Sequence, residues 1–231
     1  MCFSAEADFV AGAVISAVGV ATLTEARAPN ELPLAVLPLA FGLHQITEGF
    51  VWLGLEGETS ASVGRAAMYA YLAFAWALLP LLAPLAIFLV EPLRRRRRLL
   101  APFVVLGGIV GVLLAERLVH ETVTARINGH VVEYFGGGGA GGLLTAGYVI
   151  ATCGTFLLSS RGYIRWFGVA NAAAVAVLVV VQSQALTSLW CVWAAVVSFL
   201  VLLQLRDWRR EERRGANDPI GSSRAPSRVS R

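Results

Sequence analysis

Two polar residues inside an apolar stretch are the clearest candidates for chemistry. His44 and Glu48 lie in residues 41–49, within a longer apolar run. Their i, i+4 spacing puts both side chains on one face if the run is helical. An imidazole and a carboxylate so placed could ligate a divalent transition metal such as zinc, or form an acid–base pair. The same pair could instead only hold helices together through a hydrogen bond, and the sequence leaves these alternatives open.

Two further residues could join such a site from other parts of the chain. Cys2 lies at the N-terminus, where removal of Met1 would expose an amine and a thiol on one residue. His120 follows a later apolar run. It could take part in the site, or it could only belong to a solvated helix end. The hypothetical metal ligands are therefore Cys2, His44, Glu48 and His120, and the candidate catalytic residues are His44 and Glu48.

The elements that must position these residues are apolar runs of membrane-spanning length. The chain is 57% hydrophobic with a mean hydropathy of +0.67, and runs of about 20 apolar residues are long enough to cross a bilayer. We expect an all-α integral membrane protein, a bundle of seven transmembrane helices. The expected spans are residues 9–25, 33–55, 66–90, 99–115, 141–160, 164–181 and 184–205.

The arginines predict the orientation of the bundle. The net charge is +4 and the chain contains no Lys, which excludes a retinal Schiff base. Seven spans with a cytoplasmic C-terminus put 16 of the 19 arginines on the inner side, as the positive-inside rule requires. The N-terminus is then extracellular, and this location of the charge argues against nucleic acid as a partner. Glu6 and Asp8 stand where a signal peptide would carry basic residues.

The longest extracellular segment, between the fourth and fifth spans, predicts a short β-hairpin. Residues 122–127 and 130–134 are β-prone and flank Asn128 and Gly129, a pair that favours a type I′ turn. After the seven-helix domain, residues 1–206, we expect a cytoplasmic Arg-rich tail, residues 207–231. Its Ser, Pro, Arg and Gly content favours disorder.

Two motifs resemble those of an uncharacterised family of bacterial multi-pass membrane proteins. They are Met-Cys-x-Ser at residues 1–4 and Gln-x-x-Glu-Gly at residues 45–49. The resemblance implies that Cys2, Ser4, Gln45 and Glu48 are the family's characteristic polar positions, and it implies no activity. A second likeness, to seven-helix metal-dependent hydrolases such as alkaline ceramidases, is poor, because the seventh span contains no His and the third no Asp.

The sequence is compatible with three hypotheses for function. The first is an intramembrane metal or acid–base site at His44 and Glu48 that opens to the extracellular side and acts on a lipid or small molecule. The second is a transporter or small-molecule binding protein that uses the same polar face. The third is a structural or partner-binding membrane protein. In every case the lipid bilayer is the expected surrounding partner.

Overall fold

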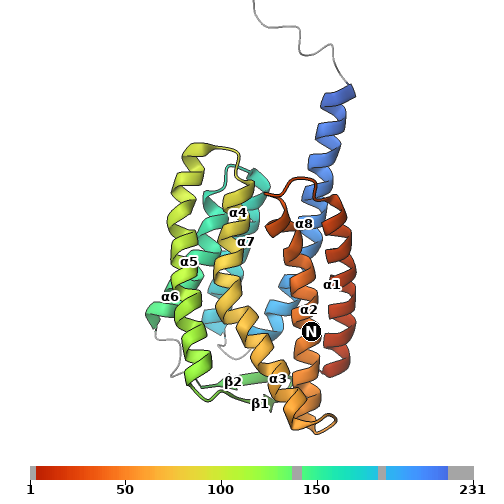
Figure 1. The fold of residues 1–231 in the computed structure, drawn as a ribbon, viewed down its shortest axis with the longest axis vertical. Coiled ribbons are helices and arrows are strands. Elements are labelled where there is room, and N and C mark those ends of the chain that lie inside the picture. The colour runs from red at the N-terminus through yellow and green to blue at the C-terminus, as the bar shows by residue number, and fades with distance from the viewer. Residues whose placement is uncertain (1–3, 137–141, 182–185, 218–231) are drawn as a thin grey trace, which may run out of the picture.

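The computed structural model describes residues 4–136, 142–181 and 186–217, which form a mostly helical bundle with a small sheet at one end (Figure 1). The helices are α1 (Ala5–Glu25), α2 (Leu32–Glu56), α3 (Ala61–Leu72), the π-helix η1 (Ala73–Leu78), α4 (Leu79–Val90), α5 (Arg94–His120), α6 (Gly142–Leu158), α7 (Gly162–Val181) and α8 (Leu186–Asn217). The described helical segments make seven rods, because α3, η1 and α4 follow one another without a break. Each predicted span coincides with one rod.

Several of these rods have the length and composition of membrane helices. Among the described residues, Ala5–Glu25, Leu32–Glu56, Ala61–Val90 and Arg94–His120 are long and apolar enough to cross a membrane, and Gly142–Leu158 is a shorter apolar helix. The rods extend beyond several predicted ends. α5 begins within the arginine run at Arg94, and α8 continues to Asn217. Residues 207–217, expected to belong to a disordered tail, are therefore helical.

The first two helices form a closely packed antiparallel pair. α1 begins after Ser4, whose hydroxyl accepts a hydrogen bond from the Ala7 N–H at 3.3 Å, a standard N-cap. A Cβ on Gly19 would clash with the backbone of Leu39, and one on Gly42 would clash with Ser16. Small residues at such contacts let two helix backbones approach, and this approach brings Asp8 on α1 against α2.

The third rod changes from α- to π-helix before a proline. η1 ends at Leu78, two residues before Pro80, and a proline nitrogen cannot donate to the helix ladder. The Tyr148 hydroxyl of α6 donates a hydrogen bond of 2.9 Å to the Ala75 carbonyl within η1. Such bonds from neighbouring helices let an irregular helix persist in an apolar bundle.

The predicted hairpin is present, with a different turn. Strands β1 (Thr124–Asn128) and β2 (Val131–Phe135) pair antiparallel, with Asn128 opposite Val131. The two turn residues are therefore Gly129 and His130, and not Asn128 and Gly129. Gly129 has φ +65°, and positive φ is confined to glycine throughout the described residues. Glycine at the first central position is the pattern of a type II′ turn, so the type I′ prediction was wrong.

Candidate functional site

The α2 helix presents three neighbouring polar residues near the hairpin end of the bundle. Gln45 and Glu48 are 2% and 0% exposed, and His44 is half-buried. Spacings of three and four residues put their side chains on adjoining parts of one helix surface. Burial of a carboxylate in an apolar bundle costs free energy unless partners compensate it. The residues that surround Glu48 therefore determine what this site can do.

A second carboxylate, Asp8 of α1, lies against the same surface and is also fully buried. The Gln45 side-chain amide donates a hydrogen bond to Asp8 Oδ1. The other oxygen, Oδ2, has no hydrogen-bond partner among the residues that the structure describes. The indole of Trp52 lies beside Asp8 without reaching hydrogen-bonding geometry. Among the described residues, Asp8 is thus held through one of its two oxygens.

Glu48 and Asp8 belong to one site. It interacts electrostatically with Asp8 and forms a hydrogen bond with the hydroxyl of Tyr71 on α3. Tyr71 is itself only 7% exposed. Two negative charges this close in a medium of low dielectric constant repel strongly. Binding of one proton or one cation between the carboxylates would remove that repulsion.

His44 contacts aromatic rings and not the carboxylate of Glu48. Its imidazole stacks on Tyr71 with ring centroids 3.9 Å apart and an interplanar angle of 10°, and it lies 4.8 Å from the ring of Phe74. Its Nδ1 is buried and makes no hydrogen bond within the described ranges. The direct His44–Glu48 contact that the i, i+4 spacing suggested is therefore replaced by contacts of both side chains with Tyr71.

The hairpin covers the site through Tyr134 of β2. Its ring stacks on Tyr71 at 5.2 Å, and its hydroxyl is buried with no hydrogen-bond partner in the described part of the chain. The neighbouring Glu133 accepts hydrogen bonds from Asn128 (2.8 Å) and Arg126 (3.0 Å). These bonds, first from Asn128 and then from Arg126, hold the pKa of Glu133 below its usual range. The hairpin is thus held together by these side-chain hydrogen bonds. It covers the site by placing Tyr134 at the end of a stack of three rings, Tyr134, Tyr71 and His44.

Of the four hypothetical metal ligands, His120 lies away from this site and Cys2 is not placed. His120 is exposed at the end of α5, and Cys2 lies outside the described residues. Among the residues that are described, no group of three or more His, Cys, Asp and Glu side chains could hold a metal ion. Instead, the structure places a second carboxylate and two tyrosines near Glu48. Asp8, Tyr71 and Tyr134 were missed as site residues, and only the acidic character of Asp8 was a signal.

Comparison with known proteins gives a family and no activity. No curated protein and no solved structure matches the chain. One family model matches residues 1–217, almost the whole chain, in agreement with the predicted membership of an uncharacterised family. The chain belongs to DUF6629, a family of unknown function.

Proposed function

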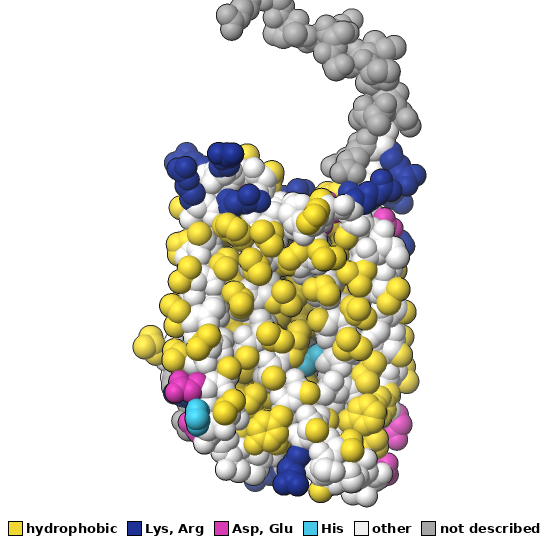
Figure 2. Space-filling model, in the orientation of Figure 1, with side chains coloured by type: hydrophobic (Ala, Val, Ile, Leu, Met, Phe, Trp, Pro, Cys, Tyr) yellow, Lys and Arg dark blue, Asp and Glu magenta, His cyan; other side chains and the backbone are white. Residues whose placement is uncertain are grey.

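We propose that the protein is a seven-span membrane protein with its N-terminus and hairpin outside the cell and its C-terminus in the cytoplasm. The arrangement of side chains in Figure 2 supports this proposal: hydrophobic residues cover the middle of the visible face, and most arginines gather at one end. That end carries the start of α5 and the C-terminal part of α8. An arginine-rich end on the cytoplasmic side follows the positive-inside rule. The hairpin end would then face outward.

Its function, in this proposal, is acid–base chemistry at a membrane-embedded carboxylate pair, Asp8 and Glu48. The observation that carries the proposal is the complete burial of two electrostatically interacting carboxylates on adjacent helices. Ionisable residues inside membrane segments are rare, and they mark proton relays and substrate pathways. Carboxylate pairs whose environment forces them to share a proton act as acid and base in other sites.

The remaining residues have positioning roles under this proposal. Gln45 orients Asp8, and Tyr71 donates its hydroxyl to Glu48 while its ring carries His44. Tyr134 and the hairpin limit the access of water from the extracellular side. A proton could then pass between the pair and a lipid or small molecule that reaches the site from that side. A transporter that uses the same pair as a proton relay is the alternative within this mechanism.

Infrared difference spectroscopy of the protein in lipid tests the shared proton directly. A protonated buried carboxyl group gives a carbonyl stretching band that shifts on transfer to deuterated water. We expect this band in the wild type, and its loss or displacement in Glu48→Gln and Asp8→Asn. Glu56→Gln is the matched control, because Glu56 is exposed at the end of the same helix. A band that is unchanged in both site variants would overturn the proposal.

Metal analysis separates this proposal from the predicted metal site. Purified wild-type protein, His44→Ala and Glu48→Gln would be compared for bound zinc and other transition metals. The carboxylate-pair proposal expects no loss of metal in either variant. A stoichiometric metal that both substitutions remove would favour the site predicted from Cys2, His44, Glu48 and His120. It would also show that residues outside the described ranges complete it.

A structural role is the second candidate, and one observation favours it. The Gln45–Asp8 hydrogen bond lies within the closely packed α1–α2 pair, where interhelical polar contacts strengthen packing. If the cluster serves only this purpose, His44→Leu combined with Glu48→Leu leaves the folded protein and its cellular phenotype unchanged. A folded double variant with a lost phenotype would instead require chemistry at the site.

A further inference from the structure

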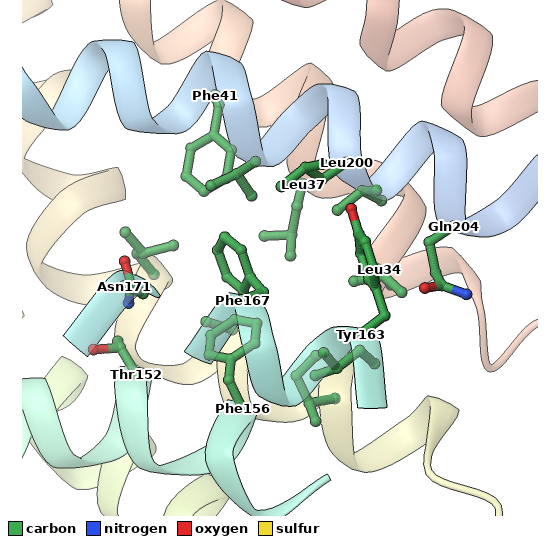
Figure 3. Close-up of a pocket in the computed structure, with 16 residues that line it drawn as sticks. Leu34, Leu37, Phe41, Thr152, Phe156, Tyr163, Phe167, Asn171, Leu200 and Gln204 are labelled. Carbon is green, nitrogen blue, oxygen red and sulfur yellow. The ribbon is translucent and has the colours of Figure 1, made fainter. Parts of the chain in front are cut away.

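A separate cavity lies on the arginine-rich side of the polar cluster. It has a volume of about 80 Å³ and is lined by residues of α2, α4, α6, α7 and α8 (Figure 3). Its walls are almost entirely aliphatic and aromatic, with Phe41, Phe156 and Phe167 around its middle. Apolar cavities exclude water and accept apolar molecules. The contents of this cavity are therefore expected to be hydrocarbon.

The few polar groups of the cavity are divided between its two ends. Thr152 and Asn171 lie together at one end, and Tyr163 and Gln204 lie at the other (Figure 3). The first pair is engaged within the protein: the Thr152 hydroxyl donates to the Tyr148 carbonyl at 2.8 Å, and the Asn171 amide donates to Cys153 Sγ at 3.1 Å. That end offers little to a polar group and suits the tip of a hydrocarbon chain.

The opposite end leads to a positive charge. Tyr163 is the second residue of α7, and Gln204 lies one helical turn before Trp208 on α8. The Arg161 guanidinium lies 3.8 Å from the centre of the Trp208 ring. Trp208 packs in the same buried cluster as residues that line the cavity, among them Leu34. A cation is therefore held where the cavity approaches the arginine-rich surface.

We propose that this cavity binds part of one acyl chain of an anionic phospholipid, whose phosphate binds near Arg161. The apolar walls match the chain, and the positive charge matches the headgroup. Arginine pairs with phosphate through several N–H donors in a fixed geometry. If the arginine-rich end is cytoplasmic, the site faces the leaflet where anionic lipids attract basic segments. The proposed occupant is a bilayer lipid and not a soluble metabolite, because the polar groups at the end with Thr152 and Asn171 already make hydrogen bonds within the protein.

Photolabelling tests the occupant and its position. The full-length protein would be reconstituted in phosphatidylcholine vesicles with a trace of phosphatidylglycerol that carries a diazirine near the end of one acyl chain. We expect the label on peptides of α4, α6 and α8 that line the cavity. Unlabelled phosphatidylglycerol should compete. A phosphatidylcholine probe should label these peptides about tenfold less, because its phosphate is accompanied by a choline cation that the Arg161 guanidinium repels.

Matched variants separate the cavity from the outer surface of the bundle. Ala83→Phe would fill the cavity, because Ala83 is buried in its wall, and it should abolish cavity labelling. Ala70→Phe adds the same ring at an exposed position of α3 and should leave labelling unchanged. Arg161→Gln should reduce labelling by phosphatidylglycerol about tenfold, whereas Arg94→Gln, at an exposed position of α5, should not.

Three results would overturn this proposal. They are wild-type label confined to outward-facing positions, equal labelling by the two headgroup classes, and undiminished labelling of a folded Ala83→Phe variant. If Ala83→Phe does not fold, the position of the wild-type label and the headgroup competition still decide the question. Both measurements use the unmodified protein, and neither depends on the carboxylate pair.

Discussion

The two ends of the bundle differ in how many hydrogen-bond partners their buried charged groups have. At the arginine-rich end, the carboxylate of Glu91 is 1% exposed and accepts hydrogen bonds from the Ser159 hydroxyl (3.1 Å), the Ser160 N–H (2.8 Å) and the Leu93 N–H (3.2 Å). The Ser160 hydroxyl donates a further bond. One carboxylate thus joins the α4–α5 loop to the α6–α7 loop, and both its oxygens are satisfied.

A second junction at the same end also pairs buried charged groups. Arg209 of α8 donates from Nε to the Glu25 carbonyl at 2.7 Å and forms an ion pair with Glu31. Glu31 also accepts a bond from the Arg27 N–H at 3.1 Å. These contacts tie α8 to the loop between α1 and α2. Buried charges with full sets of partners restrict the arrangement of the elements they join.

The hairpin end lacks this completeness. The carboxyl groups of Asp8 and Glu48 are both fully buried, and several polar atoms at this end have no hydrogen-bond partner within the described residues: Asp8 Oδ2, His44 Nδ1, Trp52 Nε1 and Tyr134 Oη. Proteins satisfy most buried polar groups, so such a concentration of exceptions needs an explanation. Under the proposed function, the arginine-rich end is organised for stability and the hairpin end for a bound proton or ligand.

The largest expected effect is the removal of Glu91. Glu91→Ala leaves buried donors of Ser159 and Ser160 without acceptors, and we expect a loss of about 3 kcal/mol in the free energy of unfolding. Chemical denaturation in detergent or lipid measures it, with exposed Glu58→Ala as the control. If the two variants lose equal stability, the arginine-rich end is not organised as described.

The same junction predicts a pH dependence. Burial by itself would raise the pKa of Glu91, but hydrogen bonds from the Ser160 hydroxyl and N–H, then from Leu93 and Ser159, hold the pKa below its usual value of 4.5. Because the pKa of Glu91 is lowered in the folded state, the ionised Glu91 carboxylate contributes fully to the free energy of unfolding above about pH 4.5. This contribution is lost as the pH falls through the folded-state pKa. Unfolding measured from neutral to acid pH should show this loss in the wild type. The loss should be smaller in Glu91→Gln, and an identical profile for the two proteins would contradict the prediction.

At the hairpin end, removal of one charge should have the opposite sign. Glu48→Gln keeps a group that can accept a hydrogen bond from Tyr71 and removes one of two buried ionisable groups, so we expect a gain of about 1 kcal/mol in stability. The same denaturation assay measures this gain, and Glu56→Gln again serves as the control. A loss of stability comparable with that of Glu91→Ala would mean that the two ends are built alike, and it would favour the structural role.

The helices could be predicted from the sequence, because each apolar run determines its own helix with little help from the rest of the chain. Within the described residues, each of the seven predicted spans overlaps one helical segment. The ends were less predictable: the arginines from Arg94 are hydrophilic enough to resemble a loop, yet they begin α5. The hairpin turn lies one residue later than predicted, because Gly129 takes the positive φ of the turn while Asn128 continues the strand.

The site was only half predictable. His44, Gln45 and Glu48 share one helix, and their spacing shows that they are neighbours. Asp8 and Tyr71 belong to other helices, and a single sequence does not say which helices pack together or how far each is rotated about its axis. Asp8 also lies just before the predicted first span, residues 9–25, whereas the helix begins at Ala5 and carries Asp8 into the bundle.

The smallest expected effect concerns the cover of the site. The Arg126 side chain is 63% exposed in its ion pair with Glu133, and exposed pairs contribute little, so Arg126→Ala should cost about 0.5 kcal/mol. Val132, 1% exposed, lies next to Tyr134 on the same strand. Val132→Ala should cost at least about 1 kcal/mol, because it leaves a cavity beneath the hairpin. If thermal unfolding ranks the variants in this order, burial and not the surface ion pair holds Tyr134 over Tyr71. The reverse order would make the ion pair the element that keeps the site closed, so its sensitivity to salt would become a way to open it.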